Sequence, residues 1–151
     1  MAFEFYPHKT FNNPTAEDFF RTFAGDRIGN GVYRCVYEYL PDASLVLKVE
    51  TDPHSFANII ENRTWNNVKD HKIAKFFAPC IFISPRGQFL IQKRTRALDG
   101  RNMPKKIPAL IDDTHTDNWG IFENRVVCHD YGNQMTLKAS ILQPMKQAKW
   151  R

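Results

Sequence analysis

Two glycines spaced by one residue, Gly29 and Gly31, stand at the start of a predicted β-hairpin, and Val36 follows five positions after Gly31. Such a turn lets backbone N–H groups approach phosphate oxygens, while the valine side chain can cover an apolar base. Lys48 ends the apolar run 45–47, and from there its ammonium group can reach phosphate oxygens. Each feature also has an ordinary interpretation, because tight turns often contain glycine and most lysines at strand ends point into solvent.

Glu61 lies in the middle of the next predicted helix, on the same side as Trp65. A carboxylate at this position can pair with Lys48 and hold its ammonium group in place. Glutamates on exposed helix faces are common, so the pairing is a hypothesis that depends on how the helix packs.

Carboxylate and amide side chains also occur in two later segments. Asp113 precedes Asn118 by five residues, and Asp130 follows the short predicted strand 126–128 and leads into Gly132. An aspartate can orient an attacking hydroxyl or accept its proton, while an asparagine side-chain oxygen can complete the ligand shell of Mg²⁺. Asp130 can bridge Mg²⁺ to nucleotide phosphates. These segments are more specific than the glycine turn.

Local patterns predict the elements that must position these residues. Thr15 and Ser55 are expected to cap two helices, and Gly25 to end the first. Runs rich in β-branched, aromatic and other apolar residues predict two pairs of strands joined by short turns. The predicted helices span 16–23 and 56–70, and the predicted strands span 32–39, 44–49, 80–83 and 88–92. Residues 107–132 are rich in Asp, His and Asn, a composition typical of functional loops.

Composition limits the class of protein. The chain has 151 residues, of which 42% are hydrophobic and 25% charged, so it predicts one globular unit and excludes disorder and collagen-like structure. The net charge of +5 favours anionic ligands. No apolar run is long enough to span a bilayer, and the N-terminal residues do not resemble a signal peptide. Three cysteines without a Cys-x-x-Cys pair indicate a reducing, cytoplasmic compartment.

The sequence resembles the protein-kinase-like superfamily over residues 28–132. The resemblance lies in the order of its features along the chain: the glycine turn, the strand lysine, the helix glutamate and the two acidic segments. Residues 113–118 look like the Asp-x-His-x-x-Asn loop of aminoglycoside and choline kinase relatives, and 130–132 are similar to an Asp-Phe-Gly turn. The resemblance implies an α+β fold, with an antiparallel-sheet N-lobe that carries one main helix and a much reduced C-lobe. It divides the chain into an arm with a short helix (1–25), an N-lobe (26–93) and a reduced C-lobe (94–151).

The resemblance also implies roles for individual residues, with ATP and Mg²⁺ as the ligands. Lys48 and Glu61 would form the phosphate-positioning ion pair, and Asp113 would be the catalytic base. A hinge at 90–93, which contains Gln92, would hydrogen-bond the base through its backbone. The remaining implied residues are Gly29, Gly31 and Val36 over the nucleotide, and Asn118 and Asp130 at the metal.

Several features depart from that family pattern. Arg34 replaces the third glycine of the loop, where it could contact phosphate or occlude the pocket. Only 19 residues follow Gly132, too few for the helices that usually bind peptide substrates. A homo-oligomer or larger assembly is therefore expected to cover the reduced C-lobe. Compact proteins of this kind are expected from bacteriophage genomes, which would place the chain in the host cytoplasm.

Two functions therefore compete. The first is a kinase that transfers the γ-phosphoryl group of ATP to a protein or small hydroxyl acceptor. The second is a non-catalytic module that binds nucleotide or a partner protein, as a virion or host-takeover component. A zinc site at His115 and His129 and nucleic-acid binding by the basic surface are weaker alternatives, because neither the histidine spacing nor an aromatic stacking platform supports them.

Overall fold

The computed structural model describes residues 14–133 and 145–151, so most of the predicted N-terminal arm lies outside the described residues. Two α-helices, two 3₁₀-helices and nine strands make up the described part. In chain order these are α1 (Pro14–Phe23), β1 (Ala24–Asn30), β2 (Arg34–Tyr39), β3 (Leu45–Glu50), α2 (Ala57–Val68), η1 (Lys72–Phe76), β4 (Cys80–Ile83), β5 (Phe89–Lys93), β6 (Lys106–Pro108), η2 (Thr116–Asn118), β7 (Trp119–Phe122), β8 (Arg125–Cys128) and β9 (Met145–Gln147).

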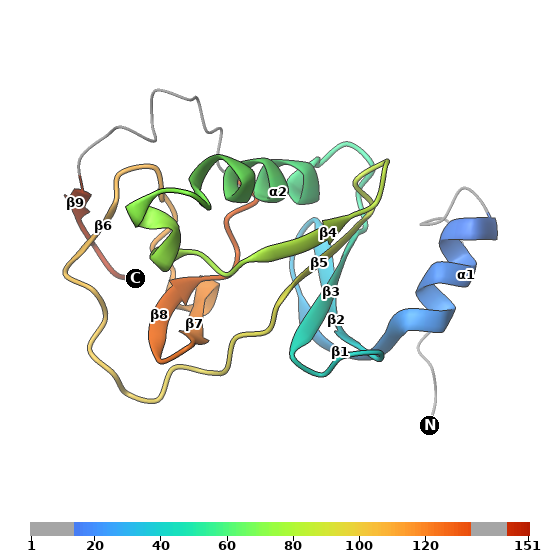
Figure 1. Cartoon of the computed structure of the whole chain (residues 1–151), viewed down its shortest axis with the longest axis horizontal. Helices are drawn as coiled ribbons and strands as arrows, with labels where there is room; N and C mark the ends of the chain where they lie inside the picture. Colours follow the sequence, from blue (N-terminus) through green and yellow to red (C-terminus); the bar gives the residue numbers. More distant parts are fainter. Residues whose placement is uncertain (1–13, 134–144) are drawn as a thin grey trace.

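Five strands form one antiparallel sheet in the order β1-β2-β3-β5-β4. Lys48 in the central strand β3 lies opposite Val36 of β2 and Leu90 of β5. Two further sheets have two strands each, β6 with β9 and β7 with β8. The mixed content of helices and antiparallel strands confirms the expected α+β class (Figure 1).

The two faces of the large sheet differ because successive side chains of a strand point to opposite sides. One face carries a cluster of apolar residues from β2, β3 and β5, including Tyr37, Leu47 and Phe89. Helix α1 covers this face, and the rings of Phe19 and Phe89 lie 4.7 Å apart while those of Phe20 and Tyr37 meet edge to face. The opposite face presents Lys48 and other polar residues, so the periodicity of β3 separates the apolar core from the charged side chains.

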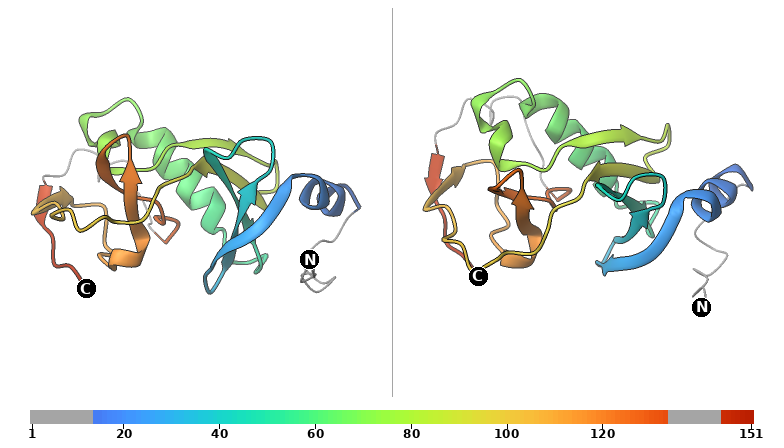
Figure 2. Two further views of the ribbon diagram at one scale, coloured as in Figure 1. Left: turned by 90° about the horizontal axis from the view of Figure 1, so that it is seen from below. Right: turned by 60° about the horizontal axis from the view of Figure 1, so that its bottom comes forward.

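A second core joins the other face of the sheet to the later part of the chain. It contains Val68 of α2 and Leu90 of β5, together with Trp119, Cys128 and Tyr131. Figures 1 and 2 show α2 running alongside the five-stranded sheet, and η1 contacts both α2 and β8. The backbone N–H of Ala78 donates to the carbonyl of Cys128, which ties the segment after α2 to β8. This core therefore brings residues near 130 next to the middle of α2.

Some local predictions were wrong at element boundaries. Gly25 is not the residue that ends the first helix: α1 ends at Phe23, and β1 begins at Ala24 and contains Gly25. A Cβ at Gly25 would lie 3.0 Å from Leu40 and 3.1 Å from Glu38, so the glycine allows β1 to approach β2 closely. Ser55 is not the N-cap of α2; that position is Phe56, in a left-handed conformation. Among the described residues, no helix has the length and apolar character needed to cross a membrane.

Candidate functional site

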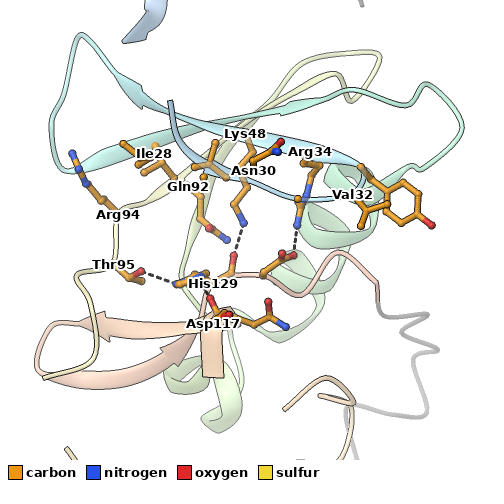
Figure 3. A pocket seen from close by; sticks show the side chains of 18 of the residues that line it. Ile28, Asn30, Val32, Arg34, Lys48, Gln92, Arg94, Thr95, Asp117 and His129 are labelled. Atoms are coloured by element: carbon orange, nitrogen blue, oxygen red, sulfur yellow. Dashed lines mark hydrogen bonds and ion pairs between the residues drawn. The ribbon is translucent and has the colours of Figure 1, made fainter. Parts of the chain in front are cut away.

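A cavity of about 580 Å³ lies between the polar face of the large sheet and the segments around residues 118 and 130. Its volume is within the range of small-molecule sites, roughly 300–1,000 Å³. Six stretches of chain contribute to its walls, as Figure 3 shows in part. The lining residues are 28–34 and Val36, Val46 and Lys48, Ala57, 92–95, Asp117 and Asn118, and His129, Asp130 and Asn133.

The turn between β1 and β2 covers one side of the cavity. The N–H of Gly31 donates to the carbonyl of Arg34 at 2.8 Å, which closes the turn. At Gly29, a Cβ would lie 3.3 Å from Cβ of Val36, so a glycine keeps the strands in close contact there. Val32 at the tip is 85% exposed. The three residues predicted over a nucleotide, Gly29, Gly31 and Val36, therefore all line this cavity.

Lys48 and Glu61 meet at the base of the cavity. Lys48 projects from β3 on the polar face, while Glu61 lies on the inner side of α2 and is fully buried. Nζ of Lys48 lies 2.6 Å from Oε1 of Glu61. Lys48 also donates to the carbonyl oxygen of His129. The structure thus contains the ion pair that the sequence suggested, and this pair contacts the segment around Asp130.

Arg34 is a third charged partner of this pair that sequence reasoning did not place. Its Nη2 lies 2.9 Å from Oε2 of Glu61 and forms an ion pair with Asp130. Its Nη1 donates to Oδ1 of Asn58 at 3.2 Å. The only signal in the sequence was an arginine at the position where the glycine-rich loop of the kinases it resembles has its third glycine. In the structure this arginine lies against α2 and the Asp130 turn, and contributes to the cavity wall.

Mutual attraction keeps these groups charged despite their burial. Burial alone raises the pKa of Glu61, but Arg34 and Lys48 outweigh it and lower the pKa below its usual range. The pKa of Asp130 is lowered in the same way, because Arg34 and Lys48 outweigh the effect of burial. Burial opposes the charged form of Arg34, yet Glu61 and Asp130 raise its pKa overall. Arg34, Glu61 and Asp130 are therefore ionised near neutral pH, and the cluster pairs two basic side chains with two acidic ones.

Asn58 at the start of α2 and Glu50 at the end of β3 support this cluster, and the sequence analysis missed both. Asn58 is fully buried, and its Nδ2 donates to the carbonyl oxygens of Lys48, Gly87 and Gln88. Oε1 of Glu50 accepts a hydrogen bond from the backbone N–H of Asn58 at 2.6 Å. An asparagine next to a predicted N-cap resembles an ordinary helix start, so local pattern alone could not identify its bridging role.

The turn at 129–132 is held by the charged cluster through its backbone. The N–H of Tyr131 donates to Oε2 of Glu61 at 2.9 Å, and the Tyr131 hydroxyl donates to the carbonyl of Ala78 at 2.6 Å. Gly132 packs closely, because a Cβ there would lie 2.7 Å from the carbonyl oxygen of Ala57. Asp130, whose side chain is 45% exposed, is therefore held at a fixed position facing the cavity.

Asn118 lies beside Asp130, as predicted from the motif order. The backbone carbonyl oxygen of Asn118 accepts hydrogen bonds from the backbone N–H groups of His129, at 2.8 Å, and Asp130, at 3.3 Å. Asn118 and Asp130 both line the cavity. Asp113 is different: it is not among the described lining residues, and its Oδ1 accepts from the N–H of His115 and lies 3.5 Å from Arg151. The structure therefore brings together all the predicted site residues except Asp113.

The predicted hinge at 90–93 lies within the sheet. Ile91 is paired with β3 on one side and β4 on the other, so its backbone groups face neighbouring strands. Gln92 does line the cavity, but its Nε2 donates to Oε1 of Glu61 at 3.1 Å. The cavity is also bordered by Lys93, the last residue of β5, and by Arg94 and Thr95, which follow it. The chain that leaves the sheet beside the cavity, Arg94 and Thr95, therefore follows the predicted hinge segment directly.

A metal ion does not fit the side chains as they are arranged here. No group of three or more His, Cys, Asp or Glu residues able to hold a metal occurs in the parts of the chain that the structure describes. The carboxylate of Asp130, one of two expected Mg²⁺ ligands, is already paired with Arg34. His129 is also engaged, because Nε2 donates to the carbonyl of Asp117 and Nδ1 accepts from the hydroxyl of Thr95.

No protein-family model matches this chain, and no curated protein matches it significantly. The assignment of the site therefore depends on its own residues and geometry.

His129 makes the stability of the fold depend on pH. Burial and the nearby Lys48 lower the pKa of His129 below its ordinary value of 6.5. Below pH 6.5 the unfolded chain binds a proton that the folded chain does not, so stability is expected to fall as the pH drops towards 5. Thermal melts across this range test the effect. His129→Gln should flatten the pH dependence of the melting temperature, whereas the exposed His115→Gln should leave it as in the wild type; equal slopes for wild type and His129→Gln would contradict the assignment.

Proposed function

We propose that this chain is a kinase-like protein that binds ATP in the cavity described above. The observation that carries the proposal is that the glycine turn, the Lys48–Glu61 ion pair and Asp130 with Asn118 all meet at one cavity. These residues come from five separate segments, so their convergence is not a consequence of a single local motif.

The lining of the cavity combines apolar and charged side chains. Ile28, Gln92 and Arg94 lie towards one end in Figure 3, and Arg34 lies towards the other, with Lys48 between. Val36 and Val46 add apolar surface, which suits a planar base. Four lining residues are positively charged, Arg34, Lys48, Lys93 and Arg94, against two that are negatively charged, Asp117 and Asp130. This excess of positive charge favours an anionic ligand such as a triphosphate.

Thermal denaturation with and without ATP tests the proposal. A ligand that binds only the folded state adds about 2.7 kcal/mol at a free concentration about 100 times its Kd. For a domain of this size we expect the melting temperature to rise by roughly 5–10 °C. Val36→Trp should abolish the rise, because Val36 lines the cavity opposite Lys48 in the sheet and the indole would fill that space without removing a charge.

Ile81→Trp is the matched control, since Ile81 is 53% exposed on β4 and does not line the cavity. It should retain the full ATP-induced rise. A rise that survives in Val36→Trp would place ATP elsewhere, and no rise at saturating ATP would overturn the proposal.

Transfer of the γ-phosphoryl group is the second candidate function. It is favoured by the hydrogen bonds from His129 and Asp130 to Asn118, which join the two acidic segments at the cavity. The position of Asp113, the expected base, outside the described cavity wall favours binding without transfer. ADP formation measured in the same ATP titrations distinguishes the two functions, and the hydroxyl acceptor stays a prediction.

A further inference from the structure

Arg34 occupies a fixed position in the wall of the cavity. It is the first residue of β2 and lies opposite Glu50 in the register with β3. Its carbonyl oxygen accepts the Gly31 N–H, and the carbonyl of the preceding Tyr33 accepts from Thr51 at 2.9 Å. The residue is only 6% exposed, although it borders the cavity. Its guanidinium group is therefore placed by the sheet and is not a mobile surface side chain.

The surrounding residues leave space for this guanidinium group between α2 and the turn at 130–132. Gly132 is essential to that space, because a Cβ there would lie 3.0 Å from Nη2 of Arg34. Asn58 accepts a hydrogen bond from Nη1, and Glu61 and Asp130 both accept from Nη2. An arginine has five N–H donors, so three bonds leave donors for a further acceptor.

The charges around Arg34 are already balanced. Arg34 and Lys48 carry two positive charges, and Glu61 and Asp130 carry two negative charges, all linked by direct contacts. A divalent cation at Asp130 would add two positive charges next to this neutral cluster. Magnesium also needs several oxygen ligands in an octahedral arrangement, whereas the guanidinium group already holds the Asp130 carboxylate.

We propose that Arg34 takes the place of a divalent metal ion beside Asp130, so that the cavity binds a nucleoside triphosphate without Mg²⁺. This inference rests on the proposed ATP-binding function. The guanidinium group neutralises Asp130, which would otherwise repel the phosphates, and directs N–H donors at phosphate oxygens. A metal ion performs the same two tasks in sites that lack such an arginine.

Calorimetric titration of the wild-type protein with ATP tests this directly, once in excess EDTA and once in excess Mg²⁺. The dissociation constants are expected to agree within about threefold. Binding that appears only with Mg²⁺ would overturn the inference and leave the proposed function intact. No binding in either buffer would overturn the proposed function itself, so the two failures are distinguishable.

Two variants sharpen the test. Arg34→Met should weaken ATP binding in EDTA by about tenfold or more, the size expected for loss of a charged hydrogen bond, and Mg²⁺ should restore part of it by occupying the released Asp130. The exposed Arg63→Met on α2 is the matched control and should bind like the wild type. Equal losses in both buffers for Arg34→Met would contradict the replacement of a metal.

Asp130→Asn keeps the test decisive if Arg34→Met does not fold. This change removes the carboxylate that a metal would need and frees the guanidinium group for phosphate. ATP binding in EDTA is expected to become tighter, with no gain on adding Mg²⁺. Weaker binding in both buffers would show that the nucleotide depends on the Asp130 carboxylate, which would overturn the inference.

Discussion

Glu61→Gln is expected to lower the melting temperature by about 10 °C, because it leaves two buried cations with a single acidic partner. Glu61 is fully buried and accepts hydrogen bonds from Lys48, Arg34, Gln92 and the Tyr131 backbone. Breaking a buried ion pair by neutralising one partner costs about 3–5 kcal/mol. In a domain of this size, each kcal/mol shifts the melting temperature by roughly 2–4 °C.

Thermal or denaturant unfolding followed by circular dichroism measures this effect. Glu38→Gln is the matched control, because Glu38 pairs with Arg94 at 3.2 Å with both side chains more than a third exposed. An exposed pair of this kind contributes only about 0–1 kcal/mol. If the two variants lose the same small amount of stability, Glu61 is not the centre of a buried cluster.

Lys48→Met is expected to reduce ATP affinity by roughly 10- to 100-fold. A hydrogen bond from a charged group contributes about 1.5–3 kcal/mol, and the methionine keeps most of the aliphatic volume while removing the ammonium group. The fold should tolerate this change better than loss of Glu61, since Arg34 still neutralises the Glu61 carboxylate at 2.9 Å. Titration calorimetry below the melting temperature gives the affinity.

Lys72→Met supplies the comparison for this variant. Lys72 is exposed at the start of η1 and does not line the cavity, so its substitution removes the same charge from the protein without touching the site. Its ATP affinity should equal that of the wild type. Equal losses in the two variants would mean that binding follows overall charge and not the position of Lys48.

Local pattern predicted most of the scaffold because the relevant forces act between near neighbours in the chain. The apolar run of β3 and the turn between β4 and β5 are local features, and both occur where they were expected. β1 was missed because its sequence, Ala24–Asn30, contains two glycines, an aspartate and an asparagine, which disfavour strands. It is a strand because β2 pairs with it, and that pairing depends on contacts rather than on propensity.

The site residues also divide into those whose position residue type and order predicted and those whose position depends on tertiary contacts. Gly29, Gly31, Lys48 and Glu61 could be selected from residue type and order, and the structure places them at or beside one cavity. Asp113 was selected by the same reasoning, yet it lies against Arg151, a residue 38 positions later in the chain. Spacing within a motif does not determine which distant segment packs against it.

The sequence by itself determined the α+β class, the main elements and the set of charged residues that could act on phosphate, since each depends on residue type and short-range periodicity. Only the tertiary structure decided how those charges combine. Arg34 is 27 residues from Glu61 and 96 from Asp130, so no local pattern could reveal that one guanidinium group binds both. The pairing exists because the second core packs the turn at 130–132 against α2, and burial there requires every charge to have a partner.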